Sequence, residues 1–125
     1  MNSVHDLVQR LSFDKQGEYR VGCEEQIIRN LPKMKGGERI VALATLAGIA
    51  EAGVYEVWRT MLHRDGKATE QELTAMRLGV ECARMAAEEA SGIALELDKY
   101  DVFGVVVKEA WDYVDQAEEY LAPAA

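Results

Sequence analysis

Three glutamates, Glu51, Glu81 and Glu88, are the residues of this sequence whose type and spacing could do chemistry. Glu51 directly follows an uncharged apolar run, where an acid is costly unless it has a partner. Carboxylates that project inward from neighbouring helices can hold Mg²⁺, and bound Mg²⁺ supports the hydrolysis of phosphate esters. One hypothesis is therefore a metal-dependent nucleotide hydrolase, or a small-ligand-binding helical bundle, with these three glutamates at its site.

The sequence lacks the paired motifs that would support this hypothesis. Glu109 and Asp112 form the one clear Glu-x-x-Asp pattern, and no Glu-x-x-Glu accompanies it. Neither histidine follows a glutamate at the Glu-x-x-His spacing of di-iron bundles. Cys23 and Cys82 are too far apart to form a metal motif. Glutamates that are solvated or paired with arginine are the simpler interpretation, and we predict no catalytic residue, no metal and no cofactor.

The last helical segment, residues 100–121, suggests a different role, because it carries more aromatic side chains than one packed face can hold. Acidic residues are interleaved with them, and aromatic anchors within a charged rim are typical of protein interfaces. The alternative is that a wide buried face takes up most of the aromatic rings. The predicted partner-binding residues are Tyr100, Trp111, Asp112, Tyr113, Asp115, Glu118, Glu119 and Tyr120.

The charge of the chain indicates what kind of partner this would be. The net charge is −8, and residues 65–125 hold fourteen acids against five Lys or Arg residues. Binding to nucleic-acid phosphates depends mainly on Lys and Arg, so direct contact with nucleic acid is disfavoured. A negative face instead steers toward a protein with a basic surface.

The elements that must position these residues are long helices. Residues 40–50 contain no charged side chain, but this run is far shorter than the ~20 apolar residues of a membrane span. We therefore expect a buried helix covered by other helices. Its packing seam recurs at spacings of three and four residues, as helix packing requires. This seam is Leu43, Ala47, Ala50, Val54, Val57 and Met61.

A second long helix is predicted after the turn at Asp65 and Gly66. Thr69 and Glu72 fit a capping box, in which each side chain bonds the other residue's amide. Five alanines between residues 83 and 94 make one surface of this helix thin. A short loop between two long helices predicts an antiparallel hairpin.

Residues 1–125 are predicted to form a single all-α domain: an up-and-down helical bundle of four main helices with a long central antiparallel hairpin. The first helix covers residues 3–30 with a break near Gly17, and Pro32 ends it. The surplus apolar surface of the central helix favours a homo-oligomer. The N-terminus has no signal-peptide pattern, so we expect a cytoplasmic protein with no membrane contact.

These observations together favour a non-enzymatic protein-interaction module. It would act as a homo-oligomer and bind another protein, one with a basic surface, through its acidic and aromatic face. Regulators, adaptors and phage-encoded inhibitors of host defence all share this profile.

Overall fold

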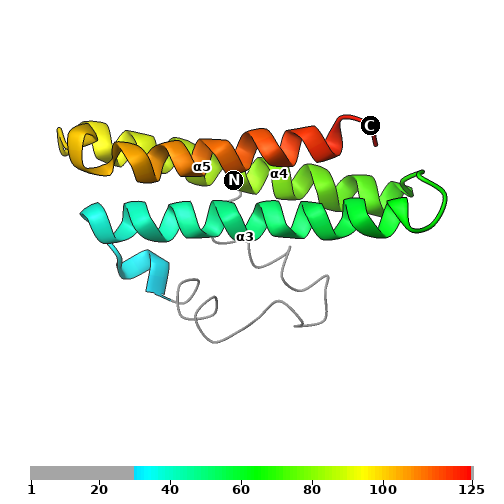
Figure 1. The fold of residues 1–125 in the computed structure, drawn as a ribbon. Helices are drawn as coiled ribbons and strands as arrows, with labels where there is room; N and C mark the ends of the chain where they lie inside the picture. Colours follow the sequence, from blue (N-terminus) through cyan, green and yellow to red (C-terminus); the bar gives the residue numbers. More distant parts are fainter. Residues whose placement is uncertain (1–29, 125) are drawn as a thin grey trace.

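The structure, a computed structural model, describes residues 30–124, which fold into three long helices packed side by side (Figure 1). A short 3₁₀ helix, η1 (Leu31–Lys33), precedes α3 (Gly36–Leu62), α4 (Glu70–Glu96) and α5 (Tyr100–Leu121). Each long helix runs antiparallel to the next, and each packs against the other two. No strand occurs among the described residues.

The all-α class and the long central hairpin, α3 with α4, are thus confirmed. The number of main helices differs from the prediction, because the described part of the chain contains three rather than four. The predicted first helix falls on residues that the structure does not describe. The central helix α3 begins at Gly36, four residues before the uncharged run of residues 40–50.

The hairpin turn between α3 and α4 is fixed by glycine and by a helix cap. Gly66 has a φ of +77°, which an L side chain rarely adopts, and its amide donates to the Met61 carbonyl at 3.0 Å. The Thr69 hydroxyl accepts from the Glu72 amide at 3.1 Å, and the Glu72 carboxylate accepts from the Thr69 amide at 2.9 Å. The capping box predicted from the sequence is therefore confirmed.

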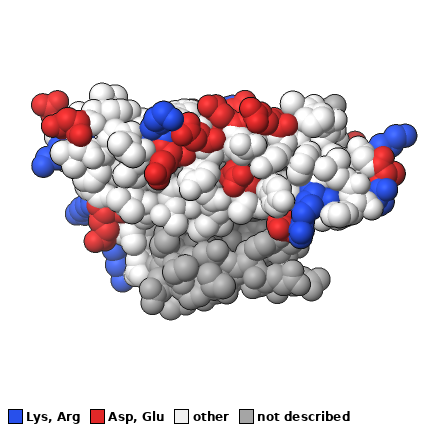
Figure 2. Space-filling view, viewed as in Figure 1, with Lys and Arg blue, Asp and Glu red and all other residues white. Residues whose placement is uncertain are grey.

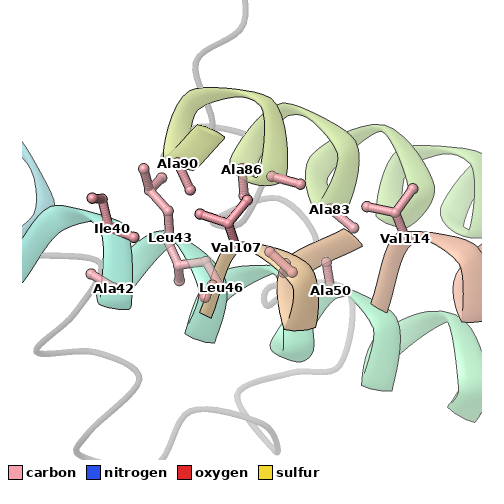
Figure 3. Packing of buried hydrophobic residues seen from close by; sticks show 14 of the residues in the cluster. Ile40, Ala42, Leu43, Leu46, Ala50, Ala83, Ala86, Ala90, Val107 and Val114 are labelled. Carbon is pink, nitrogen blue, oxygen red and sulfur yellow. The ribbon is translucent and has the colours of Figure 1, made fainter. Parts of the chain in front are cut away.

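The core lies along the line where the three helices meet (Figure 3). Leu43, Leu46 and Ala50 of α3 point toward the alanines of α4 and toward Val107 and Val114 of α5. The seam predicted on α3 is buried throughout except at Val57, which is half-buried. All five predicted alanines of α4 are fully buried: Ala83, Ala86, Ala87, Ala90 and Ala94.

Small residues let α3 and α4 approach closely. Gly79 of α4 is buried, and a β-carbon built there would collide with a methyl group of Val54. The same β-carbon would lie 3.3 Å from the Ala50 carbonyl oxygen, which is backbone and cannot rotate away. Gly79 therefore sits where the two helix backbones are too close for any side chain.

Among the described residues, α3 is the one helix long and apolar enough to cross a membrane by length and composition. The uncharged run of residues 40–50 is thus part of a longer apolar window of α3 that meets this criterion. Half of that window is buried inside the bundle, however. A core helix passes the same test, and the packing of α3 against α4 and α5 is that of a core helix.

Candidate protein-binding surface

One side of α5 forms an acidic ridge, which we define as Asp101, Glu109, Asp112, Asp115 and Glu119. These five side chains are exposed, and their spacing places them on the side of α5 opposite the buried Val107 and Val114. Figure 2 shows acidic atoms gathered over α5, with one basic group among them. The structure therefore collects into one surface three of the predicted acids, Asp112, Asp115 and Glu119.

Little of this negative charge is neutralised within the described residues. Lys108 pairs with Asp112 at 2.9 Å across one helical turn. The predicted Glu118 lies off the ridge and pairs with Arg84 of α4 at 2.9 Å. Exposed pairs of this kind contribute little to stability, about 0–1 kcal/mol. No cation of residues 30–124 forms an ion pair with the other four ridge acids.

The aromatic residues of α5 do not share the ridge. Trp111 faces α4, where its indole N–H donates to the Ser91 hydroxyl at 3.0 Å. Tyr113 lies over Gly48 of α3, so closely that a β-carbon at Gly48 would approach the ring to 3.1 Å. Tyr100 is exposed in the first turn of α5. The predicted surface is thus an acidic ridge with aromatic residues along the seams on either side of it.

Tyr120 belongs to an aromatic cluster, which we define as Tyr55, Trp58 and Tyr120. The ring centroids lie 5.8 Å apart for Tyr55 and Trp58, 5.5 Å for Tyr55 and Tyr120, and 5.0 Å for Trp58 and Tyr120. Tyr55 is 37% exposed, and the other two rings are half-buried. The cluster therefore presents aromatic surface to solvent beside the last turns of α5.

Sequence reasoning missed two members of this cluster. Tyr55 and Trp58 are three residues apart, which is the spacing of neighbours on one helix face. That signal was present, but it did not connect the pair to Tyr120, which comes from another helix. The pairing depends on how α3 and α5 pack, and spacing along one helix does not reveal it.

Glu51 lies beside the aromatic cluster. Its partial burial raises the pKa of its carboxyl above the usual value. The pKa of Tyr120 is raised too, first by burial and then by the negative charge of Glu51. Burial disfavours the ionised form of Glu51, so its negative charge is less well stabilised in the folded chain than in water.

The other two glutamates of the hydrolase hypothesis lie elsewhere. Glu81 and Glu88 are exposed on α4, and Glu81 lines a groove between α4 and α5 with Arg84 and Glu118. Within residues 30–124, no group of three or more His, Cys, Asp or Glu side chains is arranged to hold a metal ion.

Cys82 offers no nucleophile in this region. Its side chain is fully buried, and burial raises the pKa of its thiol to about 12. A thiol with so high a pKa stays protonated at neutral pH and is therefore unreactive. It packs as a small apolar residue in the core.

Comparisons of this chain with models of known protein families, with curated proteins and with solved structures found no match. The structure itself defines an all-α bundle with an acidic ridge on α5 and an aromatic cluster between α3 and α5. Its function must therefore be argued from the chemistry of that surface.

Proposed function

We propose that this protein is a non-enzymatic interaction module, a regulator, adaptor or inhibitor, that binds a basic protein through α5. The observation that carries the proposal is the charge of this helix. Residues 100–121 hold six acids and one lysine, and four of the five ridge acids have no cationic partner among the described residues.

Physical reasons connect this surface to a basic protein. Uncompensated carboxylates on one face produce a negative potential that attracts Lys and Arg and speeds encounter with a positively charged surface. The same potential repels nucleic-acid phosphates. Aromatic side chains beside the ridge, such as Tyr113 and Tyr120, add apolar contact area of the kind that dominates protein interfaces.

Charge reversal on the ridge tests the proposal. We expect the triple variant Asp112→Lys, Asp115→Lys and Glu119→Lys to lose at least about tenfold in affinity for the partner recovered with the wild-type protein. Each reversal replaces an attraction with a repulsion, and each such exposed pair is worth about 0.2–1 kcal/mol. Surface plasmon resonance at two salt concentrations measures the loss, which should shrink at high salt.

The matched control reverses three exposed acids of α4: Glu81→Lys, Glu88→Lys and Glu96→Lys. Both variants undergo the same change in net charge, so only the position of the charge differs. The proposal requires a clearly larger loss for the ridge variant. Equal losses, or binding that survives in both variants, would show that the partner uses another surface.

Self-association is part of the same proposal and is supported by exposed apolar side chains. Leu95, Val102 and Val105 are 68%, 62% and 72% exposed, near the end of the bundle where α4 passes into α5. Exposed apolar residues of this size can serve as contacts between copies of a chain. No observation among the described residues favours the hydrolase alternative.

A further inference from the structure

We propose that Glu51 and the aromatic cluster of Tyr55, Trp58 and Tyr120 form a binding spot for one arginine side chain of the basic partner. This inference rests on the proposed function, since it names the chemical group that the partner presents. According to this inference, the interface includes residues of α3 as well as residues of α5.

The first observation is how the fold pairs its half-buried glutamates. Residues 30–124 contain four of them, and three pair with arginine within the chain. These pairs are Glu56 with Arg59 at 3.0 Å, Glu72 with Arg64 at 2.6 Å, and Glu89 with Arg39 at 2.8 Å. Glu51 is the fourth, and no cation of residues 30–124 pairs with it.

This missing cation has a physical consequence. A partly buried carboxylate has lost some of its hydration, and without a counter-charge that loss is not offset. Burial is also the cause of the raised pKa of Glu51. A guanidinium group brought by a partner would supply the charge and up to two parallel hydrogen bonds.

The second observation is the aromatic surface next to this carboxylate. Tyr55 follows Glu51 by four residues on α3, so both lie on the same helix face. Tyr120 comes from α5, and the negative charge of Glu51 contributes to its raised pKa. A cation that reaches Glu51 therefore also meets aromatic rings, whose faces attract positive charge.

The geometry of the cluster favours a guanidinium group over an ammonium group. The three ring centroids are only 5.0–5.8 Å apart, so the rings fill the space between them and leave no enclosed cage for an ammonium group. Their outer surfaces remain accessible at Tyr55. A planar guanidinium can lie flat on such a surface and still reach a carboxylate, whereas the ammonium of lysine is compact and strongly hydrated.

The position of the cluster also fits a basic segment. Tyr120 directly follows Glu119, the last acid of the ridge, so the cluster lies beside the end of the ridge, about 100° around α5. A chain segment with several basic residues can place one arginine at Glu51 and others along the ridge. Charge complementarity thus identifies the occupant as an arginine-bearing segment of another protein.

The test uses Trp58 as a local reporter and octa-arginine as the probe. The chain contains two tryptophans, so a Trp111→Phe background leaves Trp58 as the sole fluorophore of its kind. We expect octa-arginine to change the Trp58 emission saturably at low salt. In this background, Glu51→Gln should weaken binding about five- to tenfold, as expected for losing a charge-assisted pair. Octa-lysine should bind several-fold more weakly than octa-arginine.

The matched control is Glu81→Gln, which removes the same charge from an exposed position on α4. It should change the affinity by less than about twofold, as expected for a solvated, screened charge. A thermal melt provides a second readout: Glu51→Gln should not lower Tm, because the ionised carboxylate opposes folding in the free protein. Weaker binding without lost stability supports a recognition role for Glu51 rather than a structural one.

Four outcomes would overturn the inference. If Glu51→Gln and Glu81→Gln weaken the binding of octa-arginine equally, only the bulk charge of the protein matters. The same holds if octa-lysine binds as tightly as octa-arginine. If octa-arginine leaves Trp58 emission unchanged, the cluster is not the binding spot. If Trp58 emission changes with protein concentration alone, a second copy of this chain covers the cluster. The proposed function is tested by a different experiment: it is wrong if the triple charge-reversal variant of the ridge still binds the partner as the wild-type protein does.

Discussion

Replacing Gly79 with alanine is expected to lower the free energy of unfolding by about 1–3 kcal/mol, the usual cost of an overpacked core. The new β-carbon would collide with a methyl of the fully buried Val54, which is β-branched and has one preferred rotamer in a helix. It would also lie 3.3 Å from the Ala50 carbonyl oxygen. The two helices must therefore move apart, and this cost exceeds the up to ~1 kcal/mol that alanine gains over glycine within a helix.

Gly92→Ala is the matched control, since this glycine is also inside α4 but has no atom of another group within 4 Å of its would-be β-carbon. It should raise the free energy of unfolding by up to about 1 kcal/mol through helix propensity alone. Urea unfolding followed by circular dichroism measures both changes. Equal stabilisation by the two substitutions would contradict the close approach of α3 and α4 at Gly79.

Leu43→Ala is expected to cost about 2–5 kcal/mol, the range for truncating a buried leucine. Leu43 is 0% exposed and lies at the centre of the core formed by all three helices. Since domains of this kind are stable by about 5–15 kcal/mol, this single change removes a large part of the total. Thermal and urea unfolding both report the loss.

Val41→Ala is the corresponding control on the same helix, because Val41 is 48% exposed. Its effect should stay within about 0.5 kcal/mol, as is usual for surface substitutions. If Leu43→Ala prevents folding altogether, Leu43→Val offers a smaller truncation at the same position. If both Leu43 variants have the same free energy of unfolding as the wild-type protein, the packing of Leu43 described above is wrong.

Much of the fold could be predicted from the sequence because periodic patterns report directly on helix faces. The spacing from Leu43 to Met61 identified the buried side of α3, and Thr69 with Glu72 identified the start of α4. The alanine run predicted a thin surface on α4, and its five alanines are fully buried. These signals are local, so they needed no knowledge of how the helices pack.

The candidate surface was predicted less completely, because it depends on contacts between helices. The acidic residues of α5 are exposed, since their spacing places them opposite the buried seam. The aromatic residues of α5 were expected on the same surface, but Trp111 contacts Ser91 and Tyr113 lies over Gly48. The spacing of residues along one helix does not reveal which neighbouring helix an aromatic side chain packs against.

Glu51 illustrates the same limit in another way. Its position after an uncharged run correctly singled it out as an unusual acid, and partial burial raises its pKa. The hydrolase hypothesis grouped it in one site with Glu81 and Glu88. The structure instead places it beside Tyr120 of α5, because three helices pack around one line and α5 lies against this face of α3.

The measurement that tests the central claim most directly is nuclear magnetic resonance mapping of octa-arginine on the isotope-labelled wild-type protein. We predict that the amide shift changes concentrate in residues 51–58 of α3 and 101–120 of α5, and that they weaken as salt is added. Changes spread evenly over all acidic surfaces, or concentrated on the exposed acids of α4, would contradict a dedicated binding face.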